Sequence, residues 1–255
     1  MKNKFTILGC GSSLGSPWIT NYKGKLKKNS KNLRTRCCAH FYYKGLSFLI
    51  DTSPDIKYQF LKNKINSLDA IIYTHEHADQ TSGIFEMRPF FWKNKKKIPV
   101  YGSSRTINEL KDKYTFCFSE RHGYKPIMIA NTVKKKFVIK KEKNSFLIEP
   151  FDVTHGMIKA TGYIFDKIAY ISDCNKISIK NIKKLFNLNY LIIDCLNMKK
   201  HPSHFNFDDA LDLIEIVKPK KSILTNLHVD LDYFKLKKKL PKNIIPAYDG
   251  LNFNF

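Results

Sequence analysis

The stretch YTHEHADQTSG, residues 73 to 83, decides how the rest of the chain is interpreted. It sets His75, His77 and Asp79 two residues apart, at the end of the apolar run LDAIIYT. Alternate side chains on extended backbone point the same way, so both histidines can face one ion. Asp79 adds a carboxylate oxygen to their imidazole nitrogens, which suits Zn, Mn or Fe. A histidine pair alone is weak evidence, but this triplet at a strand end predicts a metal site.

Three more candidate ligands lie at the ends of later apolar segments. His155 ends the second of two strands expected in KFVIKKEKNSFLIEPFDVTH, Asp173 ends the hairpin TGYIFDKIAYISD, and His228 ends the buried strand SILTNLH. Metal and catalytic groups are usually carried at strand ends, on loops that a rigid sheet holds in place. We therefore expect these side chains to meet the first triplet.

The whole set resembles the metallo-β-lactamase superfamily of metal-dependent hydrolases, and the resemblance covers nearly the entire chain. THEHADQ resembles the family's HxHxDH motif, THG around His155 its third-histidine motif, SDC around Asp173 its bridging-aspartate motif, and NLH around His228 its final histidine. The resemblance implies an α/β fold, a four-layer αββα sandwich, formed by residues 1–255 as one domain.

The resemblance also implies a division of ligands between two metals. The first would be bound by His75, His77 and His155, the second by Asp79 and His228, and Asp173 would bridge them. Gln80 stands where the family motif has its last histidine, and it can offer only a carbonyl oxygen. We expect Zn²⁺ or Mn²⁺, two per chain with the second site weaker; one metal or none are the alternatives. Asp51, at the end of SFLID, is expected to orient a ligand histidine.

Two further motifs point to phosphodiester hydrolysis. ILGCGSSLGSP, residues 7–17, resembles the opening of the branch that holds ribonuclease Z and the phosphoribosyl cyclic phosphodiesterases. HPSHFNFDDAL, residues 201–211, resembles the motif whose histidine protonates the leaving oxygen; we assign that part to His204, with His201 as the alternate. The expected enzyme is a phosphodiesterase on a small cyclic or nucleotide-like phosphodiester, using metal-bound hydroxide, and Asp79 is expected to be indispensable for catalysis.

The charge of +23 would attract anionic substrates, and RNA is a possible partner. We interpret the lysine excess as genome-wide bias, because only five of the 45 basic residues are arginine. Arg34, Arg36 and Arg88 are candidates for binding a phosphate or carboxylate with a bidentate fork. The alternatives to a small-molecule phosphodiesterase are a ribonuclease acting on tRNA or other RNA, and a catalytically weak metal- or RNA-binding scaffold. No long Gly/Pro-rich arm of the kind that grips tRNA is present.

The remaining pattern predicts location and local structure. Six scattered cysteines without a CxxC pair indicate reduced, buried thiols, and no long apolar segment or signal pattern is present. We expect a cytoplasmic protein without a membrane contact, and a homodimer is a candidate assembly. A hairpin is expected in HFYYKGLSFLIDT, a helix over SGIFEMRPFFW that Pro89 ends or kinks, and a helix over DDALDLIEIVK capped by Asn206. The basic segment KGKLKKNSK, residues 23–31, is expected to be exposed.

Overall fold

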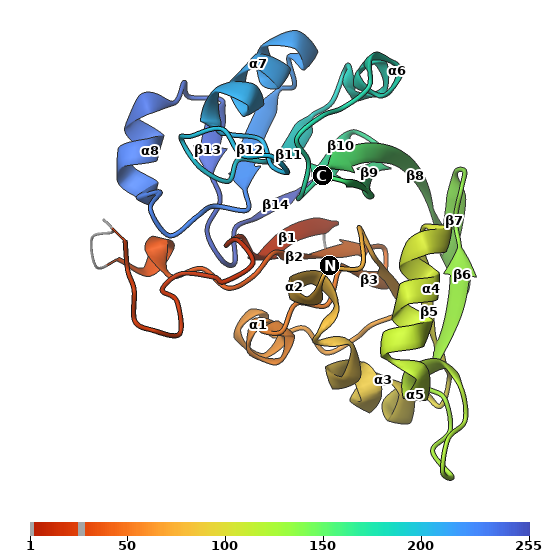
Figure 1. The fold of residues 1–255 in the computed structure, drawn as a ribbon. Helices are drawn as coiled ribbons and strands as arrows, with labels where there is room; N and C mark the ends of the chain where they lie inside the picture. The colour runs from red at the N-terminus through yellow and green to blue at the C-terminus, as the bar shows by residue number, and fades with distance from the viewer. Residues whose placement is uncertain (1–2, 25–28) are drawn as a thin grey trace.

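Two mixed β-sheets pack face to face, with helices on their outer sides (Figure 1). The computed structural model describes residues 3–24 and 29–255. The expected four-layer αββα sandwich is therefore confirmed. Residues 25–28 of the segment 23–31, which was expected to be exposed, lie outside the described residues.

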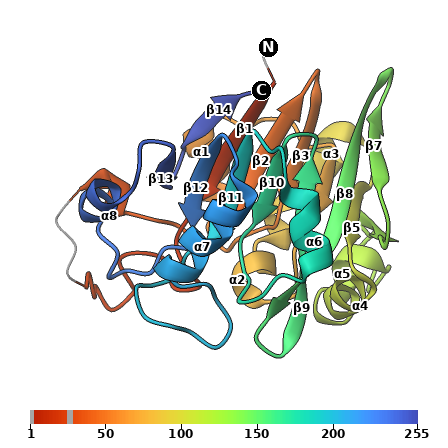
Figure 2. The ribbon, with the colours of Figure 1, turned by 90° about the horizontal axis from the view of Figure 1, so that it is seen from above.

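The first sheet has the strand order β14-β1-β2-β3-β4-β5-β6 (Figure 2). β14 to β3 pair antiparallel and β3 to β6 pair parallel. The strands are β1 Lys4–Gly9, β2 Cys38–Tyr43, β3 Leu46–Ile50, β4 Ala70–Ile72, β5 Ile98–Gly102, β6 Met128–Thr132 and β14 Asn252–Asn254. The expected hairpin is β2 and β3, which turn at Lys44 and Gly45, both with positive φ.

The second sheet has the order β13-β12-β11-β10-β9-β8-β7. β7 to β10 pair antiparallel and β10 to β13 pair parallel. The strands are β7 Phe137–Lys141, β8 Asn144–His155, β9 Ile158–Phe165, β10 Ile168–Ile171, β11 Tyr190–Asp194, β12 Lys221–Thr225 and β13 Ile244–Pro246. β8 and β10 both run antiparallel to β9, so β8, β10, β11 and β12 all end at the same edge of the sheet.

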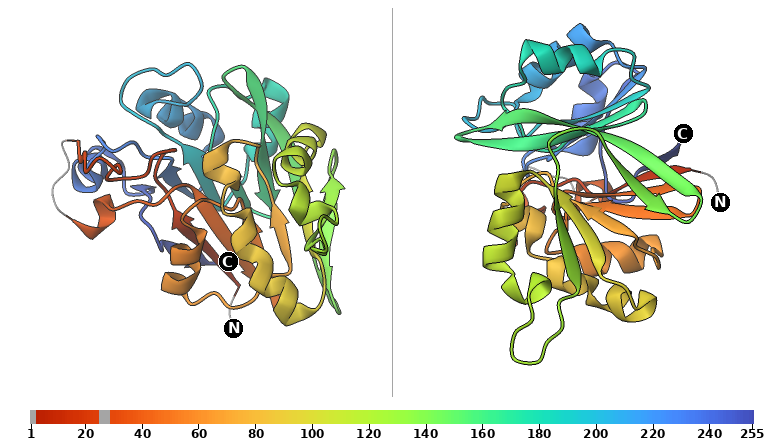
Figure 3. Two further views of the ribbon diagram at one scale, coloured as in Figure 1. Left: turned by 60° about the horizontal axis from the view of Figure 1, so that its bottom comes forward. Right: turned by 90° about the vertical axis from the view of Figure 1, so that its right-hand side faces the viewer.

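Helices cover the outer face of each sheet (Figure 3). The first sheet carries α1 Ile56–Asn63, α2 Ala78–Thr81, η2 Ile84–Met87, α3 Arg88–Asn94, α4 Ser104–Lys113 and α5 Thr115–Phe118. The second carries α6 Ile179–Ile182, η3 Lys183–Leu185, α7 Phe207–Val217 and α8 Tyr233–Lys239, and the short η1 Ser30–Asn32 lies in the loop after β1. Over residues 3–24 and 29–255, no helix combines the length and the apolar character that crossing a membrane requires.

The layer between the sheets is a tightly packed aromatic core. Phe41 of the first sheet lies 5.2 Å from Phe165 of the second, and Phe5 lies 6.1 Å from Tyr170, between ring centroids. All four side chains are fully buried. Burial of each such side chain stabilises the fold by about 1.5–3 kcal/mol, so this core keeps the two sheets, and the loops at their edges, in fixed register. The six cysteines are free and buried, as the sequence predicted.

Pro89 has a different place from the one predicted. The expected helix over residues 82–92 is divided into a 3₁₀ turn, Ile84–Met87, and α3, which begins at Arg88. Pro89 therefore stands in the first turn of a helix and does not end one. Proline is tolerated there, because the first N–H groups of a helix have no partner within it.

Candidate metal centre

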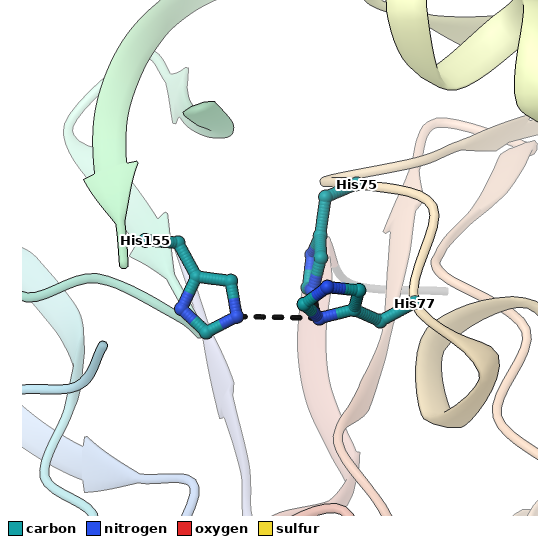
Figure 4. A group of neighbouring side chains, drawn as sticks. All are labelled: His75, His77 and His155. Atoms are coloured by element: carbon teal, nitrogen blue, oxygen red, sulfur yellow. Dashed lines mark hydrogen bonds between the residues drawn. The ribbon is translucent and has the colours of Figure 1, made fainter. Parts of the chain in front are cut away.

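Three histidine side chains converge between the two sheets (Figure 4). His75 and His77 follow β4, and His155 ends β8. His75 Nε2 lies 3.0 Å from His77 Nδ1, and His155 Nε2 lies 3.3 Å from the same atom. His75 and His155 are buried, whereas His77 faces solvent. The structure thus brings together the three ligands predicted for the first metal.

The hydrogen bonds behind these rings decide which nitrogens are free. The Thr74 hydroxyl has a single hydrogen, which it donates to Asp51 Oδ2 at 2.9 Å. Its other contact, to His75 Nδ1 at 3.0 Å, must then be a bond that the histidine donates. His155 Nδ1 likewise donates to the Ser203 carbonyl at 2.8 Å. Both Nε2 atoms therefore turn lone pairs toward His77 Nδ1, an arrangement that a bound cation stabilises. The residues present fit a divalent metal.

Asp51 acts on His75 through Thr74. Asp51 Oδ1 accepts from the Thr74 amide at 2.8 Å, and Oδ2 accepts from the hydroxyl. The carboxyl group is fully buried, and burial raises its pKa well above the usual range, against the opposing effect of the Thr74 hydrogen bonds. Its backbone has φ of 63°, a left-handed conformation that is uncommon outside glycine and asparagine. Local strain of this kind gathers at functional sites.

A second group of converging ligand atoms consists of His155, Asp173 and His204, all within 4.8 Å of one another. His204 Nδ1 lies 2.8 Å from Asp194 Oδ2 and 3.8 Å from Asp173 Oδ1. Asn226 Nδ2 donates to the Oδ1 atoms of Asp173 and Asp194, at 3.2 Å each. Asp194 and Asn226 were not among the residues predicted from the sequence, although Asp194 ends the apolar strand YLIID in the way that Asp173 follows β10.

The buried carboxylates set the protonation of His204. Burial acts to lower the pKa of His204, but its hydrogen bond to Asp194 and the charges of Asp194 and Asp173 raise it to about 9. Burial raises the pKa of Asp194 to about 7, against the stabilising effect of His204 on its charged form. His201, the alternate, is exposed, and its Nδ1 lies 3.1 Å from the Ser203 hydroxyl.

Asp79 and Asp173 approach each other across Gln80. One amide atom of Gln80 lies 3.3 Å from Asp79 Oδ2 and 3.3 Å from Asp173 Oδ2. Burial and the neighbouring Asp173 raise the pKa of Asp79 to about 6. Burial also acts to raise the pKa of Asp173, but the nearby His75, His204 and His155 outweigh it and lower that pKa.

His228 lies in the loop after β12. In the parts of the chain that the structure describes, neither group of three or more converging ligand atoms includes His228. Its Nδ1 lies 3.3 Å from Asp230 Oδ2, and its ring meets Trp18 edge-on at 5.8 Å. Its assignment to the second metal stays a prediction.

The three arginines predicted to bind substrate have other contacts. Arg34 is buried and donates to the carbonyls of His228, at 3.1 Å, and Leu231, so it holds the loop that carries His228. Arg36 pairs with Asp55 at 3.0 Å. Arg88 stacks on aromatic rings, 5.6 Å from Phe85, 4.6 Å from Trp92 and 5.2 Å from Tyr124. The contacts of Arg34 and Arg36 give no support for a role in binding substrate.

Comparisons with known proteins show what this chain is similar to. A family model described as "Beta-lactamase superfamily domain" matches residues 47–226, well over half of the chain. The chain is 29% identical over 250 residues to an octanoyltransferase of Porphyromonas gingivalis (strain ATCC BAA-308 / W83). That match covers 96% of this chain and 50% of the relative, so the chain spans about half the length of the curated protein it matches.

Solved structures resemble the chain over its full length. The crystal structure of a diphosphatase from the PhnP family has a TM-score of 0.89 and 29% identity, covering 100% of this chain and 98% of that one. Zn²⁺-bound PqqB from Methylobacterium extorquens has a TM-score of 0.76 at 12% identity, covering 99% and 100%. The short form of human tRNase Z has a TM-score of 0.68 at 15% identity, and the match covers 98% of each chain. The last two share the fold alone.

Proposed function

The chain belongs to the family described as "Beta-lactamase superfamily domain" and has the metallo-β-lactamase fold, and from this we propose that it is a metal-dependent phosphodiesterase. Its substrate would be a small cyclic or nucleotide-like phosphodiester. The observation that carries the proposal is the place of His204, whose ring lies 4.6 Å from that of His155 and which is backed by the buried Asp194. An imidazole acid beside the metal ligands suits a reaction with a poor leaving group.

In this proposal, most of the predicted ligands belong to one centre. His75, His77 and His155 would hold one divalent ion, while Asp79, Gln80 and Asp173, with His228 as a further candidate, would hold another. Zn²⁺ and Mn²⁺ both suit such donors. Bound ions of this kind lower the pKa of a coordinated water and offset the charge that develops on the phosphate.

His204 would supply the proton that the leaving oxygen needs. Its Nδ1 is engaged by Asp194 Oδ2 at 2.8 Å, so Nε2 remains to face the substrate. Asp194 orients the ring and favours its protonated form, and Asn226 ties Asp194 to Asp173. A positioned acid of this type accelerates such reactions by about 10²- to 10⁴-fold.

One relative supports phosphate chemistry, whereas another is named for acyl transfer. The similar structure at 29% identity is that of a diphosphatase, and its name describes cleavage of a phosphate bond. The octanoyltransferase name describes acyl chemistry, but the chain matches only half of that protein. Octanoyl thioesters are therefore the appropriate comparison substrates.

A ribonuclease is the second candidate, and the surroundings of Arg88 favour it. Three aromatic side chains around Arg88 are exposed: Phe85 by 46%, Trp92 by 52% and Tyr124 by 58%. Exposed rings beside a guanidinium can stack with the bases of single-stranded RNA. With a net charge of +23, such binding would weaken steeply as salt is added.

A hydrolysis screen of the metal-loaded protein tests the proposal. Cyclic ribose phosphates, bis(p-nitrophenyl) phosphate, a tRNA precursor and octanoyl thioesters would be compared, with Asp79→Ala as the inactive control. We expect turnover of the small phosphodiesters and its loss in the variant. Turnover of RNA alone would favour the ribonuclease. Thioester turnover, or inertness with Zn²⁺ and Mn²⁺ supplied, would contradict a phosphodiesterase.

A further inference from the structure

Hydrogen-bond acceptors surround both ends of the Gln80 amide. This side chain is fully buried. Asp79 Oδ2 and Asp173 Oδ2 lie 3.3 Å from the atom at one end of the amide. Asp51 Oδ2, at 3.2 Å, and the Cys37 carbonyl, at 3.3 Å, lie beside the atom at the other end. An amide has one donating end and one accepting end, so its oxygen faces other oxygens in either orientation.

The acceptors at the two ends of the Gln80 amide differ in how firmly the fold holds them. The Cys37 carbonyl is a fixed backbone acceptor, and Asp51 is anchored by two bonds from Thr74. The amide NH₂ is the matching group for that end, and it can donate to both acceptors at once. The carbonyl oxygen of Gln80 then turns toward Asp79 and Asp173.

Three oxygens from three side chains meet at this end. Asn226 occupies Asp173 Oδ1 with a 3.2 Å hydrogen bond, which leaves Oδ2 directed at Gln80. Asp79 Oδ2, Asp173 Oδ2 and the Gln80 carbonyl oxygen therefore converge, with no donor hydrogen among them. A buried group of oxygens like this is costly unless a cation joins it.

We infer that the second metal position of this chain is a site dominated by the oxygen donors of Asp79, Gln80 and Asp173, which selects Mn²⁺ or Mg²⁺, while the three histidines keep Zn²⁺. The inference rests on the proposed metal centre and concerns how the chain divides its metals. Carboxylate and amide oxygens suit Mg²⁺ and Mn²⁺, whereas imidazole suits Zn²⁺. Gln80 is the residue that determines this selectivity, because it supplies an oxygen where an imidazole would supply nitrogen.

The test is metal content, measured without substrate. The protein is stripped, incubated with equal concentrations of Zn²⁺ and Mn²⁺, freed of excess ions and analysed by mass spectrometry and by the electron paramagnetic resonance of Mn²⁺. We expect one zinc and one manganese per chain. Gln80→His should replace the manganese by a second zinc. Gln80→Glu, which keeps an oxygen at this position, should retain manganese.

The variant Gln80→Leu tests the same site by removing the oxygen ligand altogether. Loss of the carbonyl ligand should weaken Mn²⁺ binding by about tenfold or more, as changes around a metal do, and leave the zinc in place. The retained zinc also reports that the variant folds; if it does not fold, the comparison of Gln80→His with Gln80→Glu decides. Two zinc ions in the wild type, or manganese unaffected by Gln80→His, would overturn the inference. Failure of the proposed function is distinct, because it would appear as absent turnover with this metal division intact.

Discussion

At the scale of single residues, His204 depends on a partner that lies ten positions earlier in the chain. Asp194 ends β11 and His204 precedes α7, and the loop between them folds back so that His204 Nδ1 meets Asp194 Oδ2 at 2.8 Å. The motif HPSH predicted the acid but left His201 as an alternate, because spacing does not say which ring turns inward. The structure pairs His204 with the buried carboxylate and leaves His201 in solvent.

Replacing His204 by asparagine should separate two kinds of substrate. With an alkyl leaving group the rate should fall about 10²- to 10⁴-fold, because an alkoxide departs poorly without a proton. With p-nitrophenolate, which departs unprotonated, the fall should be far smaller. Steady-state kcat on a matched pair of phosphodiesters measures this, and His201→Asn is the control. Equal losses on both substrates would show that His204 does not act as an acid.

His40 is a histidine to which the sequence assigned no chemistry, and its burial predicts a pH effect on stability. Its Nε2 lies 2.8 Å from the Ser47 hydroxyl, and burial lowers its pKa from 6.5 to about 4. Between these two values the unfolded chain binds a proton that the folded chain does not. The free energy of unfolding should therefore fall as the pH falls from 6.5 toward 4, by roughly 3 kcal/mol at most, with no such effect above pH 6.5.

Urea titrations at pH 7 and pH 5 on the wild type and on His40→Gln check this expectation. The carboxylates titrate in both proteins, so the difference between the two pH dependences isolates His40. The variant should lose less stability on acidification. An identical pH dependence in the two proteins would mean that His40 is protonated without cost in the folded state.

At the scale of elements, the sequence located the strands that carry the site because they are apolar on both faces. β4, β10 and β12 are buried almost throughout, and continuous apolar runs of this kind are readable from sequence. β6, β13 and β14 were not predicted. β14 is only Asn252–Asn254, and it exists because it pairs with β1 at the opposite end of the chain. No local pattern encodes a partner so distant.

Helix ends were predictable where a side chain makes the cap. The Asn206 carboxamide accepts from the Asp209 amide at 2.8 Å, and the Asp209 carboxylate accepts from the Asn206 amide at 3.3 Å. This reciprocal cap confirms the predicted start of α7 and places the beginning of a rigid helix three residues after His204. Pro89 shows the limit of such signals, since proline both ends helices and begins them, and only the fold decides which.

At the scale of the whole molecule, the candidate metal ligands come from both sheets. His75, His77 and Asp79 follow β4 of the first sheet, whereas His155 and Asp173 belong to strand ends of the second. The sandwich was predicted from the family resemblance that these motifs carry, since strand ends alone do not say how two sheets pack. The amide environment of Gln80 was not predictable, since its four acceptors come from separate parts of the chain.

An ion that bridges the sheets should stabilise the whole fold against unfolding. A ligand present at a thousandfold excess over its dissociation constant adds about 4 kcal/mol, which corresponds to roughly 8–16 °C in the unfolding midpoint of a chain this long. We expect a chelator to lower the midpoint in differential scanning calorimetry by such an amount, and Zn²⁺ to restore it.

His77→Ala should unfold near the temperature of the stripped wild type and respond weakly to added metal, because His77 is solvent-facing and its loss removes a ligand without opening the core. Identical midpoints for the loaded and stripped wild type would mean that the ion does not hold the sheets together. A full metal response in the His77→Ala variant would mean that the stabilising ion is bound elsewhere.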